Sequence, residues 1–250
     1  RYGGKLESLP CLVEDHVYDD INLASGNQMV SAGLNNLFGE IIWFYPSSTS
    51  DVVNKMVAYN YFDSSIKRPV WTVGTLARTM WRDSAVFGKP HALEYDASTD
   101  TSFDVVGNTE GRTAYYEHET GTDQNKNGTI TAVLSNISSG DYDITQRTLR
   151  GLGGVADFRG DGEHIMKIRR FVPDFISQTG TTRITLQLKN YPNSTQGSSP
   201  LGPFDITTST TKVDTRARAR AISLKIENTA VDQSWKLGTF RLDVQPDGRR

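Results

Sequence analysis

The chain has 250 residues, of which 36% are hydrophobic and 22% are charged, and its formal net charge is −2 at pH 7. This length allows one large all-β domain or two smaller ones, and the near-neutral charge excludes polyanion binding by bulk electrostatics. Cys11 is the single cysteine, so no intrachain disulfide can form. No apolar run approaches the roughly 20 residues of a membrane helix. No signal-peptide pattern follows Arg1, and we expect a processed chain or part of a longer one.

The region Gln28–Thr75 predicts four short strands in succession. They are Met29–Leu34, Glu40–Tyr45, Lys55–Tyr61 and Val70–Val73, separated by turns rich in Asn, Ser and Asp. Four strands in about 45 residues is the size of one β-propeller blade. Both faces of Glu40–Tyr45 are apolar, which predicts a strand that is covered on both sides.

Strands are predicted to continue along the chain, with no long helix. The next candidates are His91–Tyr95, Thr113–Glu119, Thr129–Ser135, Glu163–Phe171 and Arg183–Leu188. In the last of these, Ile184, Leu186 and Leu188 share one face, as expected for a half-buried strand. Weak helical patterns occur at Asp51–Met56 and Val73–Asp83.

Two long strands, Asp214–Glu227 and Trp235–Val244, are predicted near the C-terminus. The even positions of the first begin with Arg216, Arg218 and Arg220 and then become apolar. One face of this strand therefore changes from charged to apolar part-way along.

These patterns together predict an all-β fold with two parts. Residues 1–140 are expected to form β-propeller blades, and residues 141–250 a β-rich, sandwich-like or platform unit used for packing. A single blade cannot close a propeller ring, so further blades are expected elsewhere.

The segment Asp123–Gly128 matches the first half of a calcium loop, D-x-N-x-N-G. The bidentate acid required at the twelfth position is replaced by Leu134, which cannot coordinate calcium. Asn127-Gly128 is also a strong hairpin signal, because both residues tolerate positive φ. The sequence therefore favours a hairpin over a metal site.

No residues with catalytic, cofactor-binding or metal-binding spacing stand out. The four histidines have neither His nor Cys partners at zinc-site spacing, and no nucleophile elbow, P-loop or dinucleotide fingerprint occurs. Glu117-His118-Glu119 places two carboxylates on one strand face and the imidazole on the other, which is typical of surface alternation. A non-enzymatic protein without a cofactor is predicted.

Arg216, Arg218 and Arg220 are the candidate subunit interface. Spaced by two residues on one strand, they form a line about 13–14 Å long, which could pair with an acidic row on a neighbouring subunit. Solvated side chains that cover apolar surface and direct contact with DNA phosphates are the other interpretations. The first predicts that Arg218→Glu impairs assembly.

Six segments, in order along the chain, resemble the tail nozzle proteins of short-tailed bacteriophages, also called tail tubular protein B or packaged-DNA-stabilisation proteins. They are EIIWFYPSS (Glu40–Ser48), VWTVGTLARTMW (Val70–Trp81), YYEHETGTD (Tyr115–Asp123), RRFVPDF (Arg169–Phe175), DTRARARAISLKIEN (Asp214–Asn228) and SWKLGTFRLDVQPDGRR (Ser234–Arg250). Each segment alone is a weak match, and the ordered set is fairly specific.

The resemblance implies a propeller-based subunit of a homo-hexameric ring at the distal end of the tail of the virion. Such a ring retains packaged DNA and forms the conduit for DNA ejection, so its expected partners are adaptor and fibre proteins and double-stranded DNA in passage. Members of this family are longer than 250 residues, so this chain would be their C-terminal part. The family supplies no catalytic residues to transfer.

Two alternatives remain open. A receptor- or carbohydrate-binding tail protein would use exposed aromatic side chains such as Trp81, Tyr115 or Tyr116 as sugar platforms. A glycan-cleaving propeller enzyme would need two carboxylates that flank a cleft, and nothing in the sequence selects such a pair.

Overall fold

The structure is a computed structural model, and it describes residues 8–24, 29–65, 68–84, 87–96, 112–126, 128–144, 164–191 and 200–249. The chain divides into two compact units, Arg1–Thr120 and Gly121–Arg250. Both are built from antiparallel sheets, and the described residues contain one short helix. The all-β prediction is therefore confirmed.

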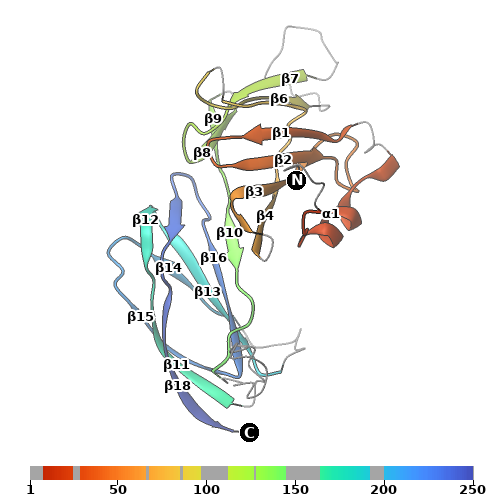
Figure 1. Ribbon diagram of the computed structural model, residues 1–250. Coiled ribbons are helices and arrows are strands. Elements are labelled where there is room, and N and C mark those ends of the chain that lie inside the picture. Colours follow the sequence, from red (N-terminus) through yellow and green to blue (C-terminus); the bar gives the residue numbers. More distant parts are fainter. Residues whose placement is uncertain are drawn as a thin grey trace. The chain divides into compact units, whose positions relative to one another are not determined.

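The first sheet of the N-terminal unit is an antiparallel meander in the order β1-β2-β3-β4 (Figure 1). Its strands are β1 (Ser31–Asn35), β2 (Glu40–Tyr45), β3 (Lys55–Ser65) and β4 (Arg68–Thr75). All four predicted strands are present, and β2 has the predicted bounds. The meander matches one blade in its strand number and connectivity, but it shows no closed propeller.

The apolar residues of β2 are buried to different extents on the two faces of the sheet. On one face, the buried Ile42 and Phe44 pack with Val53. On the other face, Trp43 stacks on Trp71 with the ring centroids 6.0 Å apart. The Ile42 face is therefore buried as predicted, whereas on the other face Ile41 and Trp43 are half-buried and the ring stacked on Trp43 belongs to β4 of the same sheet.

A second sheet, β5-β6-β7, and the helix α1 complete the described part of this unit. The bounds are α1 (Glu14–Asp20), β5 (Met80–Arg82), β6 (His91–Asp96) and β7 (Arg112–Glu117). The helical patterns at Asp51–Met56 and Val73–Asp83 were misleading, because β3, β4 and β5 occupy parts of them as strands. The helix that does form, α1, has no buried residue and no side-chain cap, so it lacks the apolar stripe by which helices are recognised.

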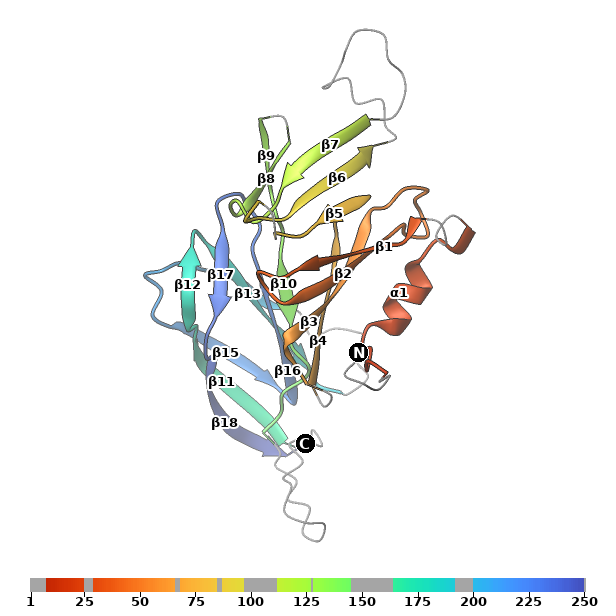
Figure 2. The ribbon, with the colours of Figure 1, turned by 45° about the horizontal axis from the view of Figure 1, so that its top comes forward.

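The C-terminal unit contains a four-stranded and a three-stranded sheet, together with two pairs of strands. The larger sheet has the order β10 (Asn136–Ser138), β16 (Ala221–Glu227), β13 (Thr182–Lys189) and β14 (Leu201–Ile206). The smaller sheet has the order β15 (Val213–Ala219), β11 (His164–Val172) and β18 (Arg241–Arg249). The pairs are β8 (Asp123–Lys126) with β9 (Thr129–Ala132), and β12 (Phe175–Thr179) with β17 (Ser234–Leu237), which Figure 2 shows side by side.

The two larger sheets of this unit share a hydrophobic core. Phe171 of β11 packs with Ile184 of β13 and Ile226 of β16, and all three side chains are fully buried. A second buried cluster joins Ile168 of β11 to Ile222 of β16. Because each cluster takes residues from both sheets, the sheets pack face to face in the manner of a sandwich.

The predicted long strand Asp214–Glu227 was wrong, because it forms two strands in different sheets. In β15 the buried positions are odd, as at Ala217 and Ala219, whereas in β16 they are even, as at Ile222 and Leu224. The chain bends at Arg220 between them. Successive side chains of a strand point to opposite faces, so the buried positions can change from odd to even only where the strand is interrupted.

The predicted strand Trp235–Val244 is also divided, into β17 and β18. Between them, the backbone N–H of Gly238 donates to the carbonyl oxygen of Asp174 over 2.7 Å. A Cβ atom on Gly238 would lie 2.8 Å from that oxygen, so only glycine allows this close approach of the two chain segments.

The boundary between the units lies earlier in the chain than the predicted boundary at residue 140. Strand β10 belongs to the larger sheet of the C-terminal unit, where Ile137 is the register partner of Ile226. The buried Asn228 side chain also donates to the carbonyl oxygen of Val133 over 2.9 Å. Residues 121–140 therefore fold with the C-terminal unit.

Candidate functional site: a basic sheet face and an apolar pocket

The outer face of the three-stranded sheet carries a cluster of basic side chains. Strands β11 and β15 pair so that Lys167 lies opposite Arg218. The alternation that buries Ile168 and Ala217 turns Lys167 and Arg218 outwards. We name this surface the basic face, and its cations are Lys167, Arg169, Arg216 and Arg218.

A β-bulge shapes the basic face. The register of β11 shifts between Ile168 and Arg170 against both of its neighbours, so Arg169 and Arg170 are both exposed instead of alternating. Bulges re-aim side chains in this way. The cations, together with Thr215 and Asp247, surround a hollow of ≈ 490 Å³.

Most of the positive charge of the basic face is not neutralised locally. Arg218 forms an ion pair with Asp247, with Nε and Oδ2 2.6 Å apart. Among the residues that the structure describes, no carboxylate pairs with Lys167, Arg169 or Arg216. The face can therefore hold an anion or a carboxylate-rich surface.

The structure brings together only two of the three arginines predicted as an interface. Arg216 and Arg218 lie on the outer side of β15, whereas Arg220 follows the end of this strand. The backbone N–H of Arg220 donates to the carbonyl oxygen of Lys189 of β13, so the straight line of three does not form. Their role as a subunit interface stays a prediction.

Sequence reasoning missed the two cations on β11. Lys167 and Arg169 alternate with the buried Met166 and Ile168, and this alternation is visible in the sequence. Nothing in the sequence pairs β11 with β15, however, because more than 40 residues separate them.

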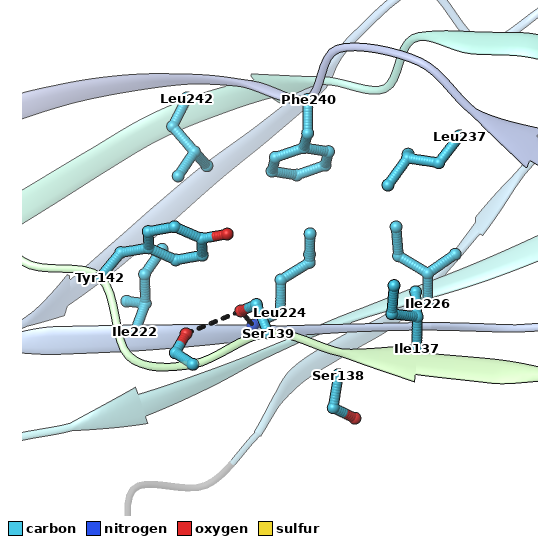
Figure 3. A pocket seen from close by; sticks show the side chains of 11 residues that line it. Ile137, Ser138, Ser139, Tyr142, Ile222, Leu224, Ile226, Leu237, Phe240 and Leu242 are labelled. Atoms are coloured by element: carbon cyan, nitrogen blue, oxygen red, sulfur yellow. Dashed lines mark hydrogen bonds between the residues drawn. The ribbon is translucent and has the colours of Figure 1, made fainter. Parts of the chain in front are cut away.

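The C-terminal unit also contains an apolar pocket of ≈ 470 Å³ (Figure 3). Leu237, Phe240 and Leu242 face it from one side. The side chains on the opposite side come from β10, the segment after it and β16, and they include Ile137, Tyr142, Ile222, Leu224 and Ile226.

The Ser139 hydroxyl at this pocket is engaged by two backbone groups. The Ser139 hydroxyl donates to the Gly140 carbonyl oxygen over 2.8 Å and accepts from the backbone N–H of Leu224 over 2.9 Å. In the part of the chain that the structure describes, no base contacts this hydroxyl, and activation as a nucleophile would need one. The lining suits an apolar side chain.

In the N-terminal unit, Arg78 is the centre of a buried polar cluster. Its side chain is 4% exposed and donates from Nη1 to Glu94 Oε2 and from Nε to His118 Nε2, each over 2.9 Å. The guanidinium also lies over the Tyr116 ring at 4.0 Å from its centroid. The cluster ties the segment before β5 to β6 and to the end of β7, which is a structural role.

His118 is neutral within this cluster. Burial is the main cause that lowers its pKa to about 4, and the charge of Arg78 adds to it. The prediction that Glu117-His118-Glu119 alternates on a strand surface was wrong, because β7 ends at Glu117 and Glu119 has φ of 60°. The imidazole is instead turned towards Arg78.

The hairpin predicted around Asp123–Gly128 is confirmed. Strand β8 pairs with β9, with Lys126 opposite Thr129, and Gly128 has φ of +82°. The Asn125 side-chain oxygen accepts from the Gly128 N–H over 2.9 Å, which supports the turn. Asn127 lies outside the described residues. In the described part of the chain, no group of three or more potential ligands gathers around a metal position.

Only one of the three predicted sugar platforms is exposed. Trp81 packs against Phe44 and donates from its indole nitrogen to the Leu34 carbonyl oxygen, and Tyr116 is buried at 9% exposure. Tyr115 is 64% exposed and stacks on the His91 ring.

No protein-family model matches the chain, and no curated protein matches it either. Within the described ranges, no helix is long and apolar enough to span a membrane. Cys11 is half-buried and unpaired.

Proposed function

We propose that the protein is a structural, non-enzymatic component of a phage tail nozzle, which retains packaged DNA and forms the conduit for its ejection. The observation that carries this proposal is the ordered set of six segments that resemble tail nozzle proteins. In this proposal the chain acts as a rigid β-subunit of a homo-hexameric ring located in the virion. Its first sheet is one blade of a propeller that other parts of the ring complete.

The places of these segments in the fold support the proposal. In the N-terminal unit they supply Phe44, Arg78 and His118, which belong to the buried core and the buried polar cluster. In the C-terminal unit they supply Phe171 and Ile226 of the shared core. The resemblance therefore includes the residues that determine how each unit packs.

The charge distribution is compatible with a conduit for DNA. Each contact between a cation and a phosphate releases counterions and adds affinity, which would slow a duplex that must slide. The chain is near-neutral as a whole, and on the basic face Asp247 already pairs with Arg218. In this proposal the conduit is lined by other surfaces.

Immunogold labelling tests the proposal. Antibodies raised against the chain are applied to purified virions of the phage that carries its gene, and label at the tail tip is expected. Negative-stain images of the complete protein should show six-fold rings. Virions without the protein would refute the proposal, as would a complete protein that remains monomeric and binds sugar.

One observation favours the alternative of a carbohydrate-binding tail protein. Phe87 and Tyr115 are 58% and 64% exposed, and both rings contact the ring of His91 between them. Exposed aromatic rings of this kind serve as sugar platforms. A glycan array distinguishes the two functions: binding that is lost in Tyr115→Ala would favour the alternative.

A further inference from the structure

The basic face is assembled at an electrostatic cost within the C-terminal unit. Lys167 and Arg218 are direct register partners on neighbouring strands, and like charges directly opposite each other destabilise a sheet. Arg169 and Arg216 add two further cations around the same hollow. A bound partner that supplies carboxylates would relieve this repulsion.

The helix α1 of the N-terminal unit carries the opposite charge. Its seven residues include Glu14, Asp15, Asp19 and Asp20, and its last turn has no basic residue. Asp15 and Asp19 are exposed and four residues apart, so they lie on one face and repel each other. Carboxylates at the C-terminal end of a helix also oppose its dipole.

We propose that α1 of one copy of this chain binds the basic face of a second copy. This inference rests on the proposed function, because it assigns the contact by which subunits of the nozzle join. The acidic helix and the basic face consist of different residues of the chain, so the contact is heterologous and joins copies head to tail.

The spacing of the charges fits this contact. Side chains four residues apart on a helix are separated by about 6 Å, and side chains two residues apart on a strand by about 7 Å. Asp15 and Asp19 can therefore face Arg216 and Arg218 together. The helix is about 10 Å long, which is comparable to the extent of four cations on two adjacent strands.

The surroundings of the basic face favour such a compact partner over nucleic acid. Asp214 and Asp243 are exposed at the Arg170 end of the sheet, and Asp247 borders the hollow itself. A duplex extends well beyond one bound phosphate, so these three carboxylates would repel its neighbouring phosphates.

A charge-reversal experiment on the full chain tests the proposal. The first variant is Arg216→Glu with Arg218→Glu, the second is Asp15→Lys with Asp19→Lys, and a third combines all four substitutions. Sedimentation velocity over a range of concentrations gives the dissociation constant for self-association. Circular dichroism and thermal melting confirm that each variant is folded.

We expect the wild-type chain to self-associate, and less strongly at high salt. Each separate reversal should raise the dissociation constant at least about tenfold, and the combined reversal should bring it back to within about threefold of wild type, as close charge pairs at an interface predict. Arg183→Glu is the matched control, since this exposed arginine pairs with Asp205 in the other sheet. It should leave the constant unchanged.

Three outcomes would overturn the proposal. The first is a wild-type chain that stays monomeric at all concentrations, and the second is a combined variant that fails to recover. The third is unchanged assembly of the basic-face variant accompanied by loss of binding to a fluorescent DNA duplex, which would identify nucleic acid as the ligand. Tail labelling with antibodies is independent of these variants, so the proposed function can survive the failure of this contact.

Discussion

Protonation of His118 should destabilise the N-terminal unit in mild acid. The ordinary pKa of histidine, 6.5, applies to the unfolded chain, whereas the folded pKa is about 4. Between these two pH values the unfolded chain binds more protons than the folded one. The stabilisation is therefore fully present above pH 6.5 and is lost as the pH falls towards 4.

The magnitude follows from the difference between the two pKa values. A difference of about 2.5 pH units corresponds to about 3.4 kcal/mol. His118 is only partly buried, so solvent screening reduces the expected loss to about 1–2 kcal/mol. The loss is physically reasonable, because Nε2 of His118 accepts from Nε of Arg78 and a protonated ring would present a like charge to that donor.

Urea unfolding at several pH values between 7 and 4.5, monitored by tryptophan fluorescence, measures this effect. The pH dependence of the wild-type unfolding free energy does not by itself identify His118. Burial raises the pKa of Glu40, and a raised carboxyl pKa changes the stability with pH in the opposite direction. The comparison is therefore with His118→Gln, which keeps an acceptor for Arg78 but does not titrate. His16→Gln, at an exposed position of α1, is the matched control. Equal pH dependence in wild type and His118→Gln would refute the reasoning.

Three further predictions concern packing and metal binding. Ile184→Ala removes a fully buried side chain from the core that both larger sheets share, and should lower the free energy of unfolding by about 2–5 kcal/mol in urea titrations. Gly238→Ala should cost about 1–3 kcal/mol, since its Cβ would meet a backbone oxygen at 2.8 Å; Gly121→Ala, where nothing lies within 4 Å, should be nearly neutral in the same titration. Calcium at a few millimolar should leave the melting temperature unchanged, and an increase would contradict the hairpin interpretation of Asp123–Gly128.

The strands that the sequence predicted best are those whose burial pattern is uniform along their length. Strand β2 was predicted to the residue because all of its central side chains are apolar. Strand β13 was predicted to within one residue at each end, because its buried residues Ile184 and Leu186 alternate with partly exposed ones. Asp214–Glu227 was predicted as one long strand because buried and exposed residues alternate regularly in each of its halves. The segment divides at Arg220, where the buried positions change from odd-numbered to even-numbered residues. In the sequence, this change is visible only because the even positions carry arginine before this point and isoleucine or leucine after it.

The sites were less predictable than the strands because their members come together only through tertiary pairing. Arg78 and His118 are 40 residues apart and meet within the N-terminal unit, so no partner of His118 was visible in the sequence, and the alternating pattern suggested a surface position. The basic face needed the pairing of β11 with β15. The register shift in β11 then exposed Arg170 next to the already exposed Arg169, and bulges leave no clear mark in a single sequence.

The near-neutral net charge of the chain does not show that its charged residues are distributed evenly. A net charge of −2 is compatible with evenly mixed charges, but it also results when opposite charges are collected on separate surfaces. The structure has local groups of like charge within each unit, with four cations around one hollow of the C-terminal unit and four carboxylates on the seven-residue helix of the N-terminal unit. Since long-range fields depend on net charge and short-range contacts on local charge, such a chain is poorly suited to non-specific polyanion binding. The proposed contact between α1 and the basic face of a second copy depends on these local charges and is therefore expected to be sensitive to salt.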